Sequence, residues 1–266
     1  MHSNCFAPFL LECERLATES TVSCKSMMDL LQETRDRPDL CDKQHWKGGH
    51  SFAYDDMVVS NAPPGMAKLA AQWKIDNADD LSYRAFELLN VNAYLACAAQ
   101  RAGKKIMVDF IFVHHINASI FFSAFLEQDW LPTAAKIRLL EAYTRINLLF
   151  YAASLGPQLF KHEIVDYTPD RPDSTWQSII QRSLSVPDDG HLPKLIRALA
   201  HGEALSRSWE ENGDLRAMTL PVRHSMWLRM ANMAIDSAES EPDIIKRWVR
   251  GAGSDAAWAI VGDRKQ

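Results

Sequence analysis

The chain has 266 residues and a formal net charge of -5 at pH 7, and 47 % of its residues are hydrophobic. This length and composition are typical of a folded protein with a sizeable core, so they exclude a disordered chain, and we expect one domain over residues 1–266. The negative balance, without a Lys/Arg stripe interleaved with aromatic residues, excludes a general nucleic-acid-binding protein.

Helical periodicity dominates the chain from end to end, and strand-like alternation is almost absent. Proline and glycine interrupt this pattern, for example at Pro63-Pro64-Gly65 and Gly156-Pro157. The polar stretch 34–56 is expected to be irregular, with a turn at Gly48-Gly49. The pattern predicts an all-α fold, a single compact multi-helix domain. The expected helices cover residues 8–17, 25–33, 66–74, 81–101, 105–128, 132–154, 176–184, 191–209, 225–237 and 243–249.

The segment from Ile106 to Leu126 is largely apolar and has about the ~20 residues that cross a bilayer. Four polar side chains interrupt it: Asp109, His114, His115 and Asn117. These groups are unfavourable in lipid, whereas a protein core can pair each of them. We therefore expect a helix buried on most sides, in the middle of the domain, and no membrane span.

Five cysteines form an odd set with no Cys-x-x-Cys spacing. This argues against a disulfide framework and a zinc knuckle, and predicts reduced thiols. The first residues also lack a basic stretch followed by an apolar run and a small-residue cleavage site. These features predict a cytoplasmic protein.

Two histidines are the main candidates for chemistry. His114 falls on the apolar helix, where it is either a core histidine held by a hydrogen bond or a metal ligand or acid–base group. His115 faces another side of that helix, because consecutive residues differ by about 100°. His50, in a loop, is either a surface residue or a ligand.

The second candidate, His191, follows Asp188-Asp189-Gly190 at a helix start, with Lys194 on the same face. The alternative is a capped helix end with solvated side chains. A lysine ammonium cannot bind a cation, so Lys194 would have to lose its charge or be carboxylated to bind a metal.

Nucleotide-binding and hydrolase motifs are absent: there is no Gly-x-Gly-x-x-Gly after a strand, no Walker A motif and no Gly-x-Ser-x-Gly. The sequence therefore excludes a self-contained nucleotide-binding domain. Aromatic residues and methionines are plentiful in the apolar helices. They form a core by default, but such a lining also suits a flat aromatic substrate.

Several separate segments, in the right order over residues 26–258, resemble the questin oxidase-like family. The strongest is Asp188-Asp189-Gly190-His191-x-x-Lys194 with the following Leu195-x-Arg197-Ala198-Leu199 and Gly202-Glu203. The others are Asp109-Phe110-x-x-x-His114, Trp130-Leu131-Pro132, Tyr151-Ala152-Ala153-Ser154, Met226-Trp227-Leu228 and Trp248-Val249-Arg250.

The resemblance implies an oxidoreductase of the monooxygenase or dioxygenase type from fungal secondary metabolism. Such enzymes act on aromatic polyketides of the anthraquinone type by Baeyer–Villiger oxygen insertion or oxygenative ring opening, and some use NADPH. The resemblance further implies a non-heme iron in ring-opening members, with His114 and His191 as ligands, Lys194 as a modified lysine and Asp109 as a partner of a ligand. These three ligand residues are the predicted catalytic and metal site.

The chain departs from the pattern of the family in one respect. Family members usually carry a further N-terminal half with additional histidines, and this chain begins after it, so the iron site is expected to be weaker. The other half would cover some helix faces, and the exposure of these faces in this chain predicts self-association. Two alternatives stay open: an inactive helical relative that binds a polyketide or a partner protein through the same cavity, and a partner subunit that supplies the missing half.

Overall fold

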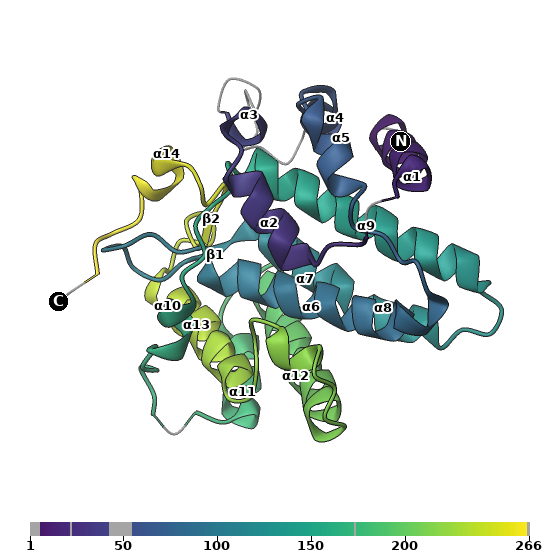
Figure 1. Ribbon diagram of the computed structural model, residues 1–266. Coiled ribbons are helices and arrows are strands. Elements are labelled where there is room, and N and C mark those ends of the chain that lie inside the picture. The colour runs from purple at the N-terminus through teal and green to yellow at the C-terminus, as the bar shows by residue number, and fades with distance from the viewer. Residues whose placement is uncertain (1–5, 22, 43–54, 173, 265–266) are drawn as a thin grey trace. The chain divides into compact units, whose positions relative to one another are not determined.

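In the computed structural model the chain is helical, as predicted (Figure 1). The structure describes residues 6–21, 23–42, 55–172 and 174–264. Within these ranges the β-structure is limited to the two-residue strands β1 (Val108–Asp109) and β2 (Trp248–Val249) and one isolated bridge. The predicted turn at Gly48-Gly49 and the candidate His50 lie outside the described residues.

Backbone contacts divide the chain into two compact units, Met1–Ala85 with Phe122–Pro157, and Phe86–Phe121 with Gln158–Gln266. The chain passes from the first unit to the second within α6 (Leu81–Ala98) and returns within α8 (Phe121–Leu126). The expectation of one domain over residues 1–266 stays a prediction.

The first unit is built around the long helix α9 (Thr133–Ala153), against which α1, α2 and α5 pack. Its core side chains follow helical spacing, as in Met27, Leu30 and Leu31 of α2, which are fully buried. The Ser26 side chain begins α2 by accepting a hydrogen bond from the Asp29 amide. The other helices of this unit are α1 (Ala7–Glu19), α2 (Met27–Arg35), α3 (Pro38–Cys41), α4 (Asp55–Ser60) and α5 (Gly65–Ala70).

The second unit centres on α12 (His191–Glu211) and α13 (Met226–Ser240), which lie side by side (Figure 1). A β-carbon at Gly202 of α12 would overlap the Trp227 ring of α13, so glycine permits this close approach. α7 (Phe110–Ser119) and α11 (Trp176–Ser185) also pack on α12. The remaining helices are η1 (Ala78–Asp80) of the first unit, and α10 (Lys161–Val165), η2 (Ala217–Thr219) and α14 (Asp255–Trp258) of the second.

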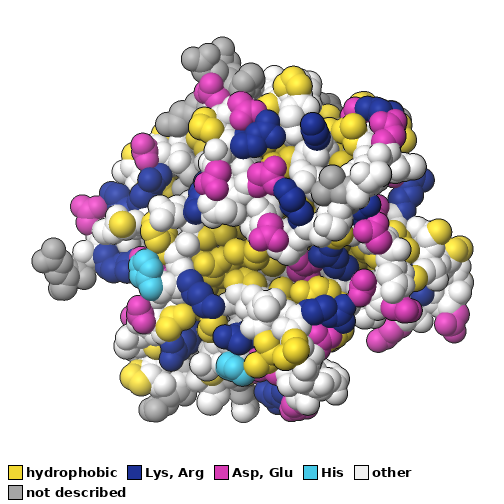
Figure 2. Space-filling model, in the orientation of Figure 1, with side chains coloured by type: hydrophobic (Ala, Val, Ile, Leu, Met, Phe, Trp, Pro, Cys, Tyr) yellow, Lys and Arg dark blue, Asp and Glu magenta, His cyan; other side chains and the backbone are white. Residues whose placement is uncertain are grey.

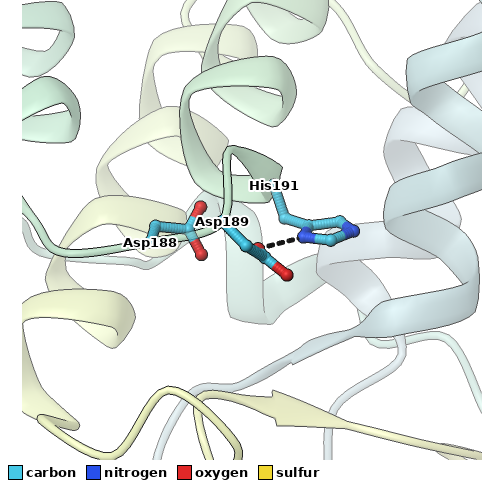
Figure 3. Close-up of side chains that lie close together, drawn as sticks. All are labelled: Asp188, Asp189 and His191. Carbon is cyan, nitrogen blue, oxygen red and sulfur yellow. Dashed lines mark hydrogen bonds and ion pairs between the residues drawn. The ribbon is translucent and has the colours of Figure 1, made fainter.

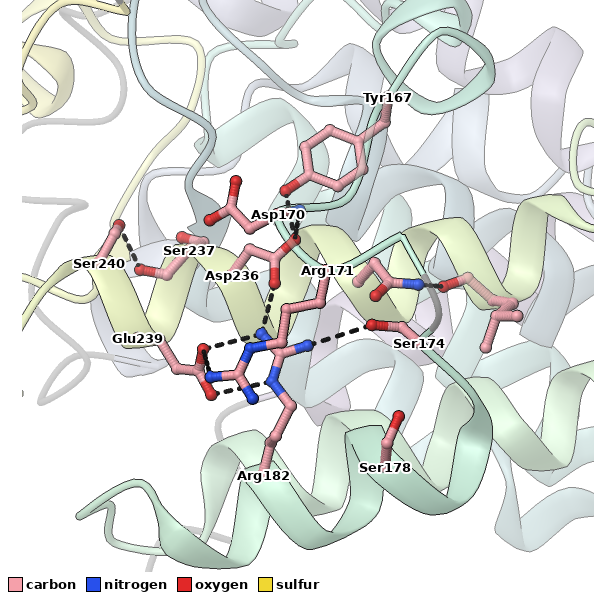
Figure 4. Close-up of polar contacts among 12 residues, drawn as sticks. Tyr167, Asp170, Arg171, Ser174, Ser178, Arg182, Asp236, Ser237, Glu239 and Ser240 are labelled. Atoms are coloured by element: carbon pink, nitrogen blue, oxygen red, sulfur yellow. Dashed lines mark hydrogen bonds and ion pairs between the residues drawn. The ribbon is translucent and has the colours of Figure 1, made fainter.

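A buried polar network joins α11 to α13 and to the loop before α11 (Figure 4). Arg182 of α11 donates to Asp236 at 2.5 Å and to both oxygens of Glu239 at 2.8 and 2.9 Å. Tyr167 donates its hydroxyl hydrogen to Asp236 at 2.8 Å. Burial and the neighbouring Asp236 carboxylate raise the pKa of Tyr167, which keeps it a hydrogen-bond donor. The network is structural, because each buried charge has an opposite partner.

The apolar segment 105–128 is not one helix, which corrects the expectation. Its first part is extended because β1 pairs in parallel with β2, Val108 opposite Trp248. Asp109 then caps α7 through Oδ1, which accepts from the Ile111 amide at 2.8 Å. After Ser119 the helix breaks into α8, where the Ser119 hydroxyl donates to the His115 carbonyl at 2.7 Å.

The predicted helix 243–249 is wrong as well, because β2 occupies its end. Backbone groups of Trp248 and Val249 pair with β1 in place of a helical partner. Within the described ranges no helix is both long and apolar enough to span a bilayer. Figure 2 shows acidic and basic side chains interspersed on the face in view, and the exclusion of nucleic-acid binding stays a prediction.

Candidate functional site

His114 and His191 lie next to each other in the second unit, although 77 positions separate them in the sequence. Their ring centres are 5.0 Å apart and the rings are inclined by 78°. His114 is on the second turn of α7, and His191 is the first residue of α12, which packs on α7. The structure thus brings together the two histidines that the sequence singled out. Their role as ligands stays a prediction.

The turn before α12 fixes the position of His191. Gly190 has a φ of +96°, a left-handed conformation that side chains other than glycine rarely adopt. Asp188 accepts a hydrogen bond from the Leu192 amide at 2.6 Å, which satisfies a free donor of the first helical turn. Arg247 stabilises this turn, because its Nη1 donates a hydrogen bond to the Pro187 carbonyl at 2.7 Å. Backbone conformation and capping together aim the His191 ring.

Asp189 forms a hydrogen bond with Nδ1 of His191 (Figure 3). This hydrogen bond lowers the pKa of the Asp189 carboxyl below its ordinary value. When Nδ1 donates to a carboxylate, the ring is held in one tautomer and its Nε2 lone pair is left available. From the sequence, Asp189 was named only as part of the segment before His191, with no role of its own. The Asp-x-His spacing is the signal that could have identified this role.

Phe110 contacts both histidines. Its ring centre lies 4.8 Å from that of His114 and 4.7 Å from that of His191. The guanidinium carbon of Arg250 lies 4.3 Å from the centre of the same ring, and Trp248 lies 6.3 Å away from it. These three residues were not predicted as site residues. Phe110 directly follows β1, Trp248 is the first residue of β2, and Arg250 directly follows β2. Sequence periodicity did not predict this strand pair.

His114 is exposed, although the helix that carries it was expected to be buried on most sides. His115, one residue further, is the buried histidine of α7, and burial lowers its pKa to about 3. Lys194 is exposed too, and its side chain lies over Gly190, with Nζ 3.5 Å from where a β-carbon there would stand. The periodicity correctly separated His114 from His115. It could not decide which of the two faced the core, because the helix is apolar on nearly every side.

The pKa of His114 is lowered, first by the desolvation that its neighbours impose and then by the positive charges of His191, Lys194 and Arg250. Asp189 opposes this shift. A lowered pKa keeps the imidazole neutral at neutral pH. A neutral imidazole is the form that binds a metal ion.

Asp109 accepts four hydrogen bonds from backbone amides of the described residues, and none of them involves His114 or His191. Its Oδ1 accepts from the amides of Ile111 and Phe112, and its Oδ2 accepts from those of Gly251 and Ala252 at 2.9 and 2.8 Å. Burial raises its pKa to about 6 despite these donors. Asp109 therefore joins the start of α7 to the end of β2, rather than orienting a ligand directly.

Among the described residues, Asp188, Asp189 and His191 each offer a ligand atom within 4.8 Å of the others, and His114 is not in this group. The ring of His114 lies beside this group, with its centre 5.0 Å from that of His191. Asp188 is the least suited of them, because it caps α12 and its Oδ1 lies 3.8 Å from Arg247. Imidazole with carboxylate is a donor set that non-haem iron accepts.

Comparison with known proteins identifies the family. A family model described as "Questin oxidase-like" matches residues 1–199. The chain belongs to the questin oxidase-like family. It is 38 % identical to a protein named questin oxidase from Aspergillus fumigatus over 96 % of this chain and 57 % of that protein. It is also 36 % identical to Baeyer-Villiger oxidase ptaJ from Pestalotiopsis fici, over 95 % of this chain and 56 % of that protein.

A third relative is Baeyer-Villiger monooxygenase AacuH from Aspergillus aculeatus, 35 % identical over 91 % of this chain and 52 % of that protein. The chain thus spans about half the length of the curated questin oxidase-like proteins it matches. The family match ends at residue 199, so it includes His114, His191 and Lys194. The resemblance read from the motifs is confirmed.

Proposed function

We propose that this chain carries out oxygenative oxidation of aromatic polyketides with anthraquinone-type rings, in secondary-metabolite biosynthesis. One observation carries the proposal: a chain of the questin oxidase-like family places His114 and His191 with their ring centres 5.0 Å apart. The names of its relatives, questin oxidase and Baeyer-Villiger oxidases, support the reaction class. The proposed location is the cytoplasm.

In this proposal His114 and His191 hold a non-haem iron through one ring nitrogen each. Bound ferrous iron supplies one-electron chemistry with dioxygen. Asp189 keeps His191 in the tautomer whose Nε2 lone pair is available. Desolvation and the nearby cation Arg250 favour the neutral form of His114, as ligation requires. The ring of Phe110, which contacts both histidines and Arg250, adds an aromatic group beside the two proposed ligands, and such groups suit a flat aromatic substrate.

Lys194 is the proposed third ligand, in carboxylated form. Its neutral amine adds carbon dioxide and releases a proton, and the product carries a carboxylate in place of an ammonium. The exposed position of Lys194, one helical turn after His191, allows this modification. NADPH is the proposed reductant when one oxygen atom is inserted, since the second oxygen atom then leaves as water and needs two electrons.

The experiment supplies the purified chain with ferrous iron, dioxygen and a hydroxyanthraquinone, with and without NADPH, and follows product mass. We expect a product heavier by one oxygen atom when one NADPH is oxidised, or by two oxygen atoms when none is. His114→Ala and His191→Ala should lose this activity, whereas His162→Ala, a change at an exposed histidine of α10, should keep it. Equal turnover by all four proteins would contradict the proposed site.

A second function is favoured by the exposure of His114. In the described chain His114 is exposed, whereas the side chain of His191 beside it is only 14 % exposed. Such a site suits a relative that binds a polyketide without turning it over. Binding of a hydroxyanthraquinone, without product at any iron or NADPH concentration, would favour this alternative.

A further inference from the structure

The two proposed ligands are attached to the same pair of strands. α7, which carries His114, begins directly after β1. Asp109 is the last residue of β1, and its Oδ1 accepts from amides in the first turn of α7. Its Oδ2 accepts from the amides of Gly251 and Ala252, which follow β2 within three residues. The β1–β2 pair therefore sets where the helix of His114 begins.

Arg247 attaches the turn that precedes His191 to the same strands. It is the residue before β2, and its side chain is 3 % exposed. Its Nη1 donates to the Pro187 carbonyl at 2.7 Å, and its Nε and Nη2 donate to the Glu241 carbonyl at 3.4 and 3.2 Å. Gly190 gives the turn wide conformational freedom, so an anchor outside the turn is needed to select one arrangement. Arg247 supplies this anchor.

The positive charge of Arg247 also has a partner in this turn. The side chain of Asp188 is 2 % exposed, and its Oδ2 accepts from the Leu192 amide at 2.6 Å. Its Oδ1 accepts no hydrogen bond from the described residues, but Nη1 of Arg247 lies 3.8 Å from it. A buried carboxylate is strongly unfavourable without an opposite charge nearby. Arg247 therefore allows Asp188 to be buried as the cap of the helix that begins at His191.

We propose that Arg247 is a positioning residue, which holds His191 at the distance from His114 that a shared metal ion requires. The inference rests on the proposed function and deepens it, because it names the group that sets the geometry of the pair. The hydrogen bonds of Arg247 go to backbone carbonyls, so it acts on His191 through the backbone of the turn. Neighbours in sequence aim the His191 ring, whereas Arg247 places the whole turn relative to α7.

The test measures binding of Co²⁺, whose visible absorption reports the number and geometry of its ligands. The proteins are the parent chain, Arg247→Lys and the matched control Arg182→Lys, a change at a buried arginine of α11 that is 7 % exposed. Both variants keep a positive charge and lose the planar fork of the guanidinium. We expect Arg247→Lys to weaken Co²⁺ binding by roughly 10-fold or more and to change the absorption of the bound ion. The control should match the parent in both measurements.

Chemical rescue provides a second measurement. Arg247 lines a cavity of about 790 Å³ together with Val186 and Pro187, so a small cation can reach the space that Arg247→Ala leaves. We expect methylguanidinium to restore part of the Co²⁺ binding of Arg247→Ala. Methylammonium has the same charge without the planar fork, so it should restore less. Neither cation should restore binding to His191→Ala, which lacks a ligand.

Three results would overturn the inference. An Arg247→Lys variant with the Co²⁺ affinity and absorption of the parent would do so and would leave the histidine pair intact. Equal loss of binding in Arg182→Lys would also do so, because general destabilisation would then explain both effects. If the parent itself bound no Co²⁺, the proposed function would fail together with the inference.

Discussion

At the scale of single residues, the ring of His191 is held mostly by its own neighbours in sequence. Gly190 supplies the left-handed turn, Asp188 caps the first helical turn and Asp189 binds Nδ1. This local origin explains why the motif pointed to His191 before any fold was known. His114 depends instead on which face of an apolar helix is turned outward, and the sequence pattern does not specify that.

Removing the Asp189 carboxylate should weaken metal binding without unfolding the chain. We expect Asp189→Ala to lower iron affinity by about 10- to 100-fold, because the His191 ring loses the group that fixes its tautomer. The control is Asp263→Ala, at a carboxylate that is 83 % exposed. Iron titration of both variants measures the effect, and equal affinities would show that Asp189 does not orient the ligand.

At the scale of elements, sequence periodicity predicted most long helices within a few residues, for example 191–209 for α12 (His191–Glu211). It missed β1 and β2, because two-residue strands have no detectable alternation and their pairing joins segments about 140 positions apart. This pair brings Phe110 and Arg250 together. The part of the site that was missed is therefore the part that depends on long-range pairing.

The close approach of α12 and α13 depends on Gly202. A methyl group at this position would overlap the Trp227 ring, so Gly202→Ala should destabilise the chain by about 1–3 kcal/mol. Gly262→Ala is the matched control, because its β-carbon would meet nothing closer than 3.6 Å. Denaturant unfolding of both variants measures the free energies. A Gly202→Ala variant as stable as the control would mean that the helices move apart freely.

The junction of α7 and β2 should give stability a dependence on pH. The pKa of Asp109 is raised to about 6 by burial, so the folded chain holds this proton more tightly than the unfolded chain does. Its contribution to stability is full below the ordinary aspartate pKa and is lost as pH rises through about 6. The Asp109→Asn variant has no carboxyl group here and should lack this pH dependence. Its side-chain NH2 group would face backbone N–H donors, and this mismatch should lower the free energy of unfolding by about 1–3 kcal/mol.

Unfolding measured from acid to neutral pH checks this prediction. The stability difference between the parent and Asp109→Asn should be largest in acid and should narrow as pH rises toward neutrality. A difference independent of pH would contradict the assignment of the raised pKa to Asp109.

At the scale of the whole molecule, family membership, helical class and the pairing of His114 with His191 could all be predicted from sequence motifs. Whether the two histidines are buried could not be predicted, because their burial depends on which parts of the chain surround α7 and α12 in space. His114 is exposed in the described chain, and the chain spans about half the length of its curated relatives.

The most direct measurement is the iron content per chain after reconstitution with ferrous iron without oxygen. The comparison is between the parent, His114→Ala, His191→Ala and the control His162→Ala. We predict close to one iron per chain for the parent and the control, and strong loss in both site variants. Iron bound equally by all four proteins, or by none of them, would contradict the central claim that His114 and His191 together form a metal site.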